Sequence, residues 1–336
     1  MDGAPEKLDI YGDTVYCFRL KGNIEHGMFV QMMNVEALTP NAPYEPISPE
    51  GLDYEPTKTI YDENGIIYIL SFANESIFRY SINDEQYLST IPLSDLSFTF
   101  TYSKSKGELY LGYDSKRITK IPAEEPFTET EFYRTQTTLG AVEAVYDNVF
   151  VACYGESNGS VLYTLNDQGI ILDNATRFYT SKSYTWGSAA GRVYSFRDGI
   201  SPNDIYSREI NEQGIMSAEM QSPYHGDYTM KYPIRISPAG DVVVLGSGAI
   251  FNAITLSDAI QLPNQILDAA WLNGNMYTLY AIDSAVQLQK WTIPGYHSQT
   301  IYQWNDAKGF ALCGVENRII AIVRQDNTPK FYSFYN

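Results

Sequence analysis

One phrase recurs eight times along the chain and constrains its fold more than any other feature. Each copy is an apolar strand, a short turn of Gly, Asn or Asp, and a second strand that is almost continuously apolar. Examples are VYDNVFVACYG at 145–155 and WLNGNMYTLYAI at 271–282. Turns of this kind between two β-patterned runs are the strongest local signal for a hairpin. The sequence therefore predicts a chain built from hairpins.

The spacing of these hairpins predicts a β-propeller. Successive second strands begin between 35 and 52 residues apart, and a third strand and often a more polar fourth strand follow each hairpin. A four-stranded unit repeated at about 40 to 50 residues is typical of a propeller blade. No long stretch shows a period of 3.6 residues, which argues against α/β folds. We expect an all-β fold, a single β-propeller of four-stranded antiparallel blades. Its second strands should begin near Thr14, Ile66, Glu108, Val149, Arg192, Asp241, Met276 and Arg318.

The number of blades depends on the first segment of the chain. Counting hairpins gives eight blades, with seven as the alternative. The last unit ends after its third strand, PKFYSFYN at 329–336, and a ring commonly completes such a blade with its N-terminus. If GMFVQMMNV at 27–35 closes the ring, residues 1–57 are irregular and seven blades remain. Otherwise residues 1–57 hold an irregular first blade. In both cases we expect one domain over residues 1–336.

Two repeats carry a resemblance to a known superfamily. RISPAGDVVVLGSGAIFNAITL at 235–256 and LDAAWLNGNMYTLYAIDSAVQLQKWTI at 267–293 resemble bacterial propellers of the YVTN, quinoprotein-like type. The resemblance implies the fold and a binding surface on one face, where loops join second to third strands and each blade to the next. The literal YVTN phrase and the Trp-docking motif of quinoprotein dehydrogenases are absent from the sequence. The resemblance therefore implies no particular activity.

Charge and composition exclude several classes of partner. The chain has 336 residues, with 23 basic and 40 acidic ones, and a net charge of −17. Such a surface repels nucleic acid and anionic membranes. No run reaches the roughly 18 apolar residues of a membrane helix, so no membrane insertion is expected. We expect a monomer that is secreted, periplasmic or at the cell surface, although the start MDGAPEKLDI carries no signal segment.

No cofactor and no catalytic residue can be assigned. The cysteines lie singly in apolar runs, the histidines lack metal-site spacing, and GxSxG and phosphate-binding motifs are missing. These six residues are Cys17, Cys153, Cys313, His26, His225 and His297. We expect neither a metal nor another cofactor. Calcium alone stays open, because acidic loops can coordinate it even without a DxDxDG motif.

Two long loops supply most of the candidate binding residues. FRDGISPND at 196–204 and QSPYHGDYTMKYP at 221–233 combine aromatic rings with hydrogen-bonding groups, as surfaces that recognise sugars or peptides do. The alternative is that the rings pack over the end of the ring as a lid. The candidates are Trp186, Arg197, Asp198, Asp204, Tyr224, His225, Asp227, Tyr228 and Lys231.

These observations favour a non-enzymatic extracellular binding or scaffold propeller that recognises a protein or a polysaccharide through its loop face. The alternative is a secreted enzyme, such as a lactonase, glycosidase or polysaccharide lyase, acting at the central funnel. Inward carboxylates, Arg and His within about 3 to 6 Å of one another, with perturbed pKa values, would favour the enzyme. A channel lined by satisfied polar groups would favour binding.

Overall fold

A computed structural model describes residues 7–11, 14–21, 29–34, 49–155, 159–293 and 295–335 of the chain. The chain divides into two compact units, Met1–Pro46 and Ile47–Asn336. The described strands of the first unit form one antiparallel sheet in the order β1-β2-β3. Their bounds are β1 (Lys7–Tyr11), β2 (Thr14–Lys21) and β3 (Phe29–Asn34).

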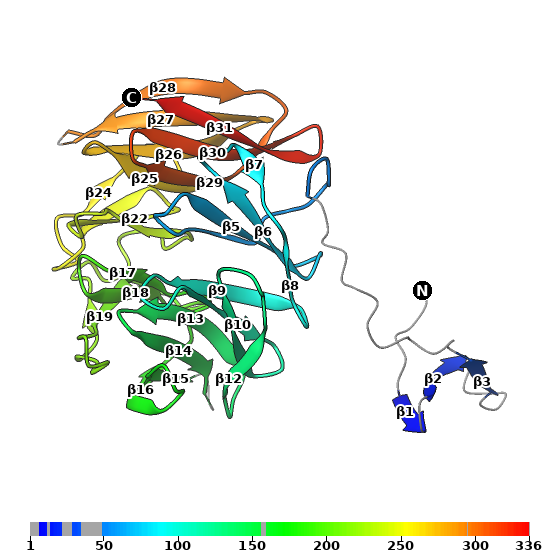
Figure 1. Ribbon diagram of the computed structural model, residues 1–336. Coiled ribbons are helices and arrows are strands. Elements are labelled where there is room, and N and C mark those ends of the chain that lie inside the picture. Colours follow the sequence, from blue (N-terminus) through cyan, green and yellow to red (C-terminus); the bar gives the residue numbers. More distant parts are fainter. Residues whose placement is uncertain are drawn as a thin grey trace. The chain divides into compact units, whose positions relative to one another are not determined.

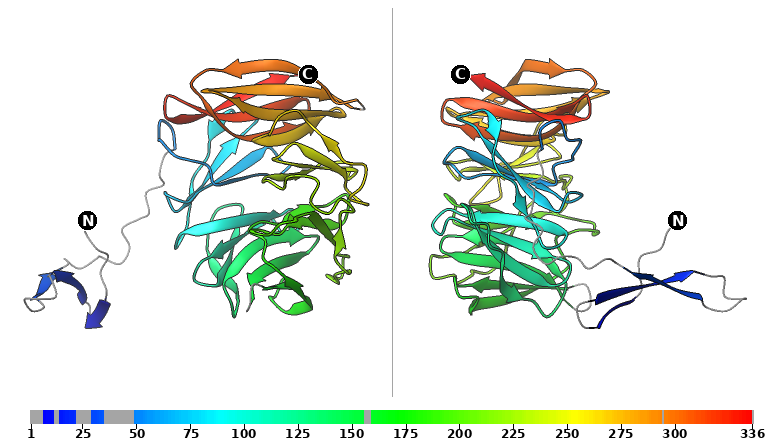
Figure 2. Two further views of the ribbon diagram at one scale, coloured as in Figure 1. Left: turned by 180° about the vertical axis from the view of Figure 1, so that it is seen from behind. Right: turned by 45° about the vertical axis from the view of Figure 1, so that its right-hand side comes forward.

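The described residues of the second unit form seven antiparallel sheets, which we call blades 1 to 7 in chain order (Figures 1 and 2). Blade 1 comprises β4 (Lys58–Tyr61), β5 (Ile66–Ser71), β6 (Ser76–Ser81), β7 (Gln86–Tyr87) and β8 (Ile91–Pro92). Blade 2 comprises β9 (Ser97–Ser103), β10 (Glu108–Tyr113), β11 (Arg117–Pro122) and β12 (Thr130–Arg134). Blade 3 comprises β13 (Leu139–Val145), β14 (Asn148–Tyr154), β15 (Gly159–Leu165) and β16 (Ile171–Phe178).

The remaining four blades follow in the same order. Blade 4 comprises β17 (Thr185–Gly187), β18 (Arg192–Phe196), β19 (Ile205–Glu209) and β20 (Met220–Gln221). Blade 5 comprises β21 (Ile234–Ile236), β22 (Val242–Leu245), β23 (Ala249–Asn252) and β24 (Ile260–Gln261). Blade 6 comprises β25 (Asp268–Leu272), β26 (Asn275–Ile282), β27 (Ala285–Thr292) and β28 (His297–Trp304). Blade 7 comprises β29 (Lys308–Val315), β30 (Arg318–Gln325) and β31 (Thr328–Tyr335).

Seven blades correct the count of eight and confirm the alternative. The second strands β5, β10, β14, β18, β22, β26 and β30 begin within one residue of the predicted positions. The additional hairpin, β1 with β2, belongs to the unit Met1–Pro46. The predicted closure of the ring by residues 27–35 is wrong, because β3 of that segment pairs with β2 and the described sheet of blade 7 contains only β29, β30 and β31. The count was one too high because a hairpin signal is local and does not say which sheets the hairpin packs against. That residues 1–57 share one domain with the propeller stays a prediction.

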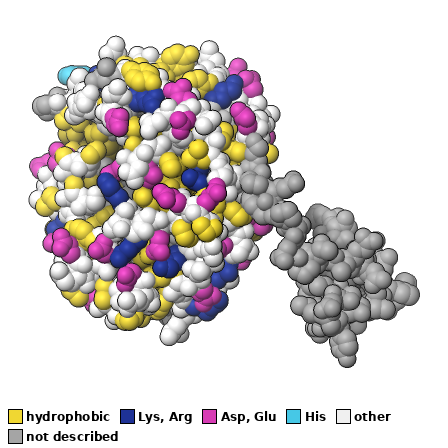
Figure 3. All heavy atoms as spheres, in the orientation of Figure 1, with side chains coloured by type: hydrophobic (Ala, Val, Ile, Leu, Met, Phe, Trp, Pro, Cys, Tyr) yellow, Lys and Arg dark blue, Asp and Glu magenta, His cyan; other side chains and the backbone are white. Residues whose placement is uncertain are grey.

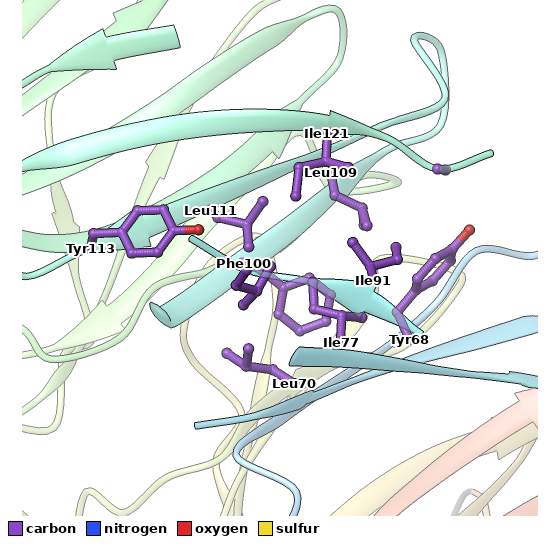
Figure 4. Close-up of a cluster of buried hydrophobic side chains, with 11 residues drawn as sticks. Tyr68, Leu70, Ile77, Ile91, Phe100, Leu109, Leu111, Tyr113 and Ile121 are labelled. Atoms are coloured by element: carbon purple, nitrogen blue, oxygen red, sulfur yellow. The ribbon is translucent and has the colours of Figure 1, made fainter. Parts of the chain in front are cut away.

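The apolar second strands are explained by burial on both faces. In β5, Ile67 and Ile69 belong to the core between blades 7 and 1, whereas Tyr68 and Leu70 belong to the core between blades 1 and 2. Successive side chains of a strand point to opposite faces, so both sets must be apolar. Figure 4 shows the second of these cores, where Phe100 of blade 2 lies among residues of blade 1.

Seven hydrophobic clusters hold the ring, one between each pair of neighbouring blades. Blade 7 has three strands, as predicted, and packs directly on blade 1 (Figure 1). At this seam Tyr80 stacks on Phe331 with ring centroids 3.7 Å apart, and Arg318 pairs with Glu85 at 3.2 Å. Within the described residues, side-chain packing rather than a shared strand closes the ring.

Candidate ligand-binding channel

The first strands of all seven blades line a central channel of about 810 Å³. Lining residues come from β4, β9, β13, β17, β21, β25 and β29 and from the loops that lead into them. A cavity of this size lies in the range of small-molecule sites, which is about 300–1,000 Å³. The charged and aromatic side chains of these strands therefore decide what the channel can bind.

An ion pair between blades 1 and 3 occupies one side of the channel. Lys58 Nζ lies 2.9 Å from Glu143 Oε1. The pair passes in front of blade 2, where the hydroxyl of Thr101 donates to the other carboxylate oxygen at 3.4 Å. Glu143 is thus held by one cation and one hydroxyl.

A second ion pair joins blades 5, 6 and 7. Arg235 Nε lies 2.6 Å from Asp268 Oδ1, and the side chain of Asp268 is only 1% exposed. The backbone N–H of Leu312, on blade 7, donates to Asp268 Oδ2 at 2.8 Å. A buried carboxylate needs such partners, because an unpaired charge away from water is very costly. Asp268 therefore fixes three neighbouring first strands and leaves the outer part of Arg235 facing the channel.

At the entrance to blade 4, Asp198 organises the residues that lead into the channel. Its Oδ2 accepts hydrogen bonds from the backbone N–H of Lys182 at 2.5 Å and from the hydroxyl of Tyr232 at 3.4 Å. Burial raises the pKa of Tyr232 above its usual range. Lys182 and Tyr232 both line the channel. Gly246 permits this arrangement, since a Cβ there would lie 1.9 Å from the carbonyl oxygen of Tyr232.

Four aromatic side chains form one layer around the channel. Each lies on the first strand of its blade and pairs with the first buried residue of the second strand. The four therefore occupy equivalent positions in their hairpins. Each is half-buried and packs against the core that its blade shares with the preceding blade. The pairs are Tyr61 opposite Ile67, Tyr102 opposite Leu109, Trp186 opposite Val193, and Trp271 opposite Met276. We call the four rings the aromatic layer.

Among the residues predicted from the sequence, Asp204 holds the two long loops together. It is buried, at 2% exposure. Its carboxylate accepts from Gln221 Nε2 at 2.6 Å, from Ser222 Oγ at 3.0 Å and from the backbone N–H of Gly226 at 3.0 Å. Both carboxylate oxygens are therefore used inside the protein, and Asp204 fixes loop 221–233 against loop 196–204.

Arg197 belongs to a cluster between blades 3 and 4 that sequence reasoning missed. Its guanidinium lies 3.2 Å from Glu219 and 4.1 Å from the ring centre of Tyr206. Arg177, whose side chain is 2% exposed, lies 3.0 Å from the other oxygen of Glu219 and donates to Ser195 Oγ at 2.7 Å. Two arginines thus share one carboxylate. The available signal was an arginine near the end of the outer strand ILDNATRF.

The predicted tyrosines of loop 221–233 pack on blade 5. Tyr224 and Tyr228 lie edge to face at 5.1 Å, and Tyr228 contacts Phe251 at 5.4 Å. The hydroxyl of Tyr224 accepts the backbone N–H of Ala259 at 2.9 Å. Lys231 donates to Gln265 at 2.5 Å.

The structure therefore brings together only part of the predicted set. His225 and Asp227 are exposed on the same loop as the tyrosines. Trp186 lies in the channel lining, edge to face with Tyr146 at 5.2 Å, and Asp198 stands beside the lining residue Lys182. The other predicted residues lie outside the lining, so their role in binding stays a prediction.

Sequence reasoning missed the charged residues of the channel lining, namely Lys58, Glu143, Lys182, Arg235 and Asp268. The signal that was available is a single charged residue inside an otherwise apolar first strand, as in AVEAV at 141–145 and PIRI at 233–236. A buried charge at such a position needs a partner, and here the partner comes from another blade.

Metal and thiol chemistry receive no support from the described side chains. In the described part of the chain, no three His, Cys, Asp or Glu residues gather as a metal-binding group. Calcium stays a prediction. Cys153 and Cys313 are buried and free, and burial raises the pKa of their thiols to about 11 and about 12. His26 and the side chain of Cys17 lie outside the described residues. No helix among the described residues is long and apolar enough to span a membrane.

Comparison with known families supports the fold. The model of the family DUF5128, described as a 6-bladed beta-propeller, matches residues 56–217, which hold blades 1 to 3 and most of blade 4. The fold is a β-propeller. Its seven sheets exceed the six of the family description. The search of curated proteins found no match to this sequence.

Solved propellers resemble the structure at low sequence identity. Hydrazine synthase from Kuenenia stuttgartiensis has a TM-score of 0.61 and 9% identity, over 84% of this chain and 97% of that chain. A functionally unknown protein from Desulfotomaculum acetoxidans has a TM-score of 0.58 and 13% identity, over 81% and 95%. The WD40 propeller domain of Doa1 has a TM-score of 0.57 and 12% identity, over 85% and 95%. At such identities the likeness concerns the fold alone.

Proposed function

We propose that this propeller is a non-enzymatic binding domain that holds part of a polysaccharide in its central channel. The observation that carries the proposal is the aromatic layer, which lies next to a layer of hydrogen-bonding side chains. Sugar rings have apolar faces and hydroxyl edges. Half-exposed aromatic rings with a few placed polar groups are suited to such a ligand.

The polar layer lies one residue from the aromatic layer along the first strands. In blades 2, 3 and 5 this position is occupied by Thr101, Glu143 and Arg235. The rise along a strand is about 3.3 Å per residue, so a sugar ring in contact with the aromatic layer lies next to this polar layer. Arg235, whose side chain is 35% exposed, is the group there that can donate to sugar hydroxyls. The two layers thus supply stacking and hydrogen bonds to the same ligand.

The state of the channel carboxylates supports binding over hydrolysis. Glu143 is engaged by Lys58 and Thr101, and Asp268 by Arg235 and the backbone of Leu312. A glycosidase needs two carboxyl groups facing the scissile bond from opposite sides. In the described channel lining each carboxylate has an internal partner, which suits a rigid polar wall.

A protein partner on the loop face is the second candidate. Asp204 fixes loops 196–204 and 221–233 against each other and leaves His225 and Asp227 exposed. A rigid, polar loop pair is a reasonable recognition surface. In either case we place the protein outside the cytoplasm, a part of the proposal that rests on its acidic composition.

Calorimetric titration of the full chain against soluble polysaccharides tests the proposal. We expect binding to at least one of them, with Trp186→Ala and Tyr102→Ala each weakening it about tenfold, which corresponds to about 1.4 kcal/mol. Tyr335→Ala is the matched control, because that ring is exposed on the outer strand of blade 7. Chromatography of the incubated glycan monitors cleavage. Release of shorter products would overturn the non-enzymatic role, and binding to none of the glycans would overturn the channel as a polysaccharide site.

A further inference from the structure

The channel lining carries a charge of opposite sign to the whole protein. Three cationic residues, Lys58, Lys182 and Arg235, line it together with two carboxylates, Glu143 and Asp268, so the net charge of the lining is +1. The chain as a whole carries −17. Carboxylate and basic side chains are interspersed over the face of the molecule that Figure 3 shows. A cation surplus inside an acidic molecule favours an anionic ligand at that place.

Lys182 is the channel cation whose ammonium group makes no ion pair with the described residues, although the carboxylate of Asp198 lies beside its main chain. Its backbone N–H is held by Asp198, which fixes the main chain at the lining. Its side chain is exposed, and its Nζ makes no ion pair or hydrogen bond with the described residues. An ammonium group in this setting is available to a ligand.

Arg235 offers a second, partly occupied cation. Its Nε faces Asp268 at 2.6 Å and one terminal nitrogen donates to the carbonyl oxygen of Ile234 at 3.0 Å. The other terminal nitrogen has no partner among the described residues, and the side chain is 35% exposed. A guanidinium group binds carboxylates through this kind of free edge.

The two cations lie on neighbouring blades at different depths. Thr185 of blade 4 contacts the carbonyl oxygen of Ile234 at 3.5 Å, which places Thr185 beside Arg235. Lys182 precedes Thr185 by three residues, up to roughly 10 Å of extended chain toward the entrance. A chain with repeated anionic groups offers a separate carboxylate to each of the two cations.

Building on the proposed function, we infer that the polysaccharide is acidic and that its carboxylates bind Lys182 and the free edge of Arg235. The aromatic layer contacts the sugar rings, and the two cations select the charged form. The ligand class is therefore uronate-containing chains.

Titration of the full chain with oligomers of polygalacturonate, alginate and hyaluronan, and with their neutral methyl esters, tests this inference. We expect at least one acidic oligomer to bind about tenfold more tightly than its ester, and to lose affinity as NaCl is raised. Lys182→Ala should weaken that binding several-fold, and Lys182→Arg should retain it. Lys330→Ala is the matched control, since Lys330 is an exposed lysine on the outer strand of blade 7.

The outcomes separate the two proposals. Equal binding of acid and ester, or unchanged binding by Lys182→Ala with an unchanged melting temperature, overturns the acidic ligand and leaves the polysaccharide site standing. If only neutral xylan or mannan oligomers bind, the acidic ligand is likewise overturned and the polysaccharide site stands. If no charged or neutral oligomer binds, both proposals are wrong. Lys182 is preferred over Arg235 for this test because removing Arg235 would leave the buried Asp268 without its counter-charge.

Discussion

Blades 4 and 7 reach the same arrangement by different means. The three strands of blade 7 have eight residues each and pair from end to end, apart from one bulge at Phe310. The four strands of blade 4 have three, five, five and two residues. Blade 4 therefore has far fewer main-chain hydrogen bonds between strands than blade 7. Other contacts must hold the loops of blade 4 in place.

Buried polar side chains supply those contacts in blade 4. Arg177 and Arg197 share Glu219, and Asp204 accepts three hydrogen bonds from Gln221 at the end of β20 and from the loop that follows it. Short strands leave long loops, and these loops lead to the channel entrance at Lys182. Blade 4 thus has fewer main-chain hydrogen bonds between its strands and longer loops than blade 7. Loops of this kind on a rigid scaffold can carry a binding site.

The largest expected effect comes from removing Arg177. Arg177→Ala should lower the free energy of unfolding by about 3–5 kcal/mol, because it leaves Glu219 with one cation and opens a gap beside Tyr206. Urea unfolding followed by fluorescence measures this loss. The control is Arg134→Ala, which removes an exposed ion pair with Glu131 and should cost less than about 0.5 kcal/mol. A loss for Arg177→Ala as small as that of the control would mean that the cluster does not hold blade 4.

Removing Asp204 should have the next largest effect. Asp204→Ala leaves three donors without their acceptor, at a cost of about 2–3 kcal/mol. Hydrogen exchange should rise in residues 221–233, since Asp204 fixes that loop. Asp204→Asn keeps one acceptor oxygen and should cost less. Unchanged exchange in the loop would show that Asp204 is not what orders it.

A buried hydrogen bond in blade 6 can be compared with those of Asp204 in blade 4, because blade 6 has long strands like blade 7. Trp291 donates its indole N–H to the hydroxyl of Thr278 at 2.9 Å, and both residues are buried. Thr278→Val should cost about 1–2 kcal/mol, because one donor loses its partner while the ladder between β26 and β27 stays intact. Urea unfolding under the same conditions measures it. A cost above that of Asp204→Ala would contradict the idea that long ladders make blade 6 less dependent on side chains.

The contrast also explains what could be predicted from the sequence. The second strands were located to within one residue, because turn and strand signals lie within a few positions of each other. The ion pair of Lys58 with Glu143 joins residues 85 apart, and Arg177 and Glu219 come from different blades. Such pairs depend on how the blades are arranged in the ring, which local patterns do not report. The sequence shows that the loops of blade 4 are long and polar, but it does not show which residues hold them in place.

The smallest expected effect tests the predicted lid of Tyr224 and Tyr228. Their rings pack beside Phe251, so alanine at either position would disturb both packing and any binding. Tyr224→Phe removes only the acceptor for Ala259 N–H and should lower stability by about 1 kcal/mol or less. Thermal unfolding measures that loss, and glycan titration of the same variant measures binding. Unchanged affinity would support binding in the channel and a purely structural role for loop 221–233. A marked loss of affinity at nearly unchanged stability would show instead that the tyrosines of this loop bind the glycan.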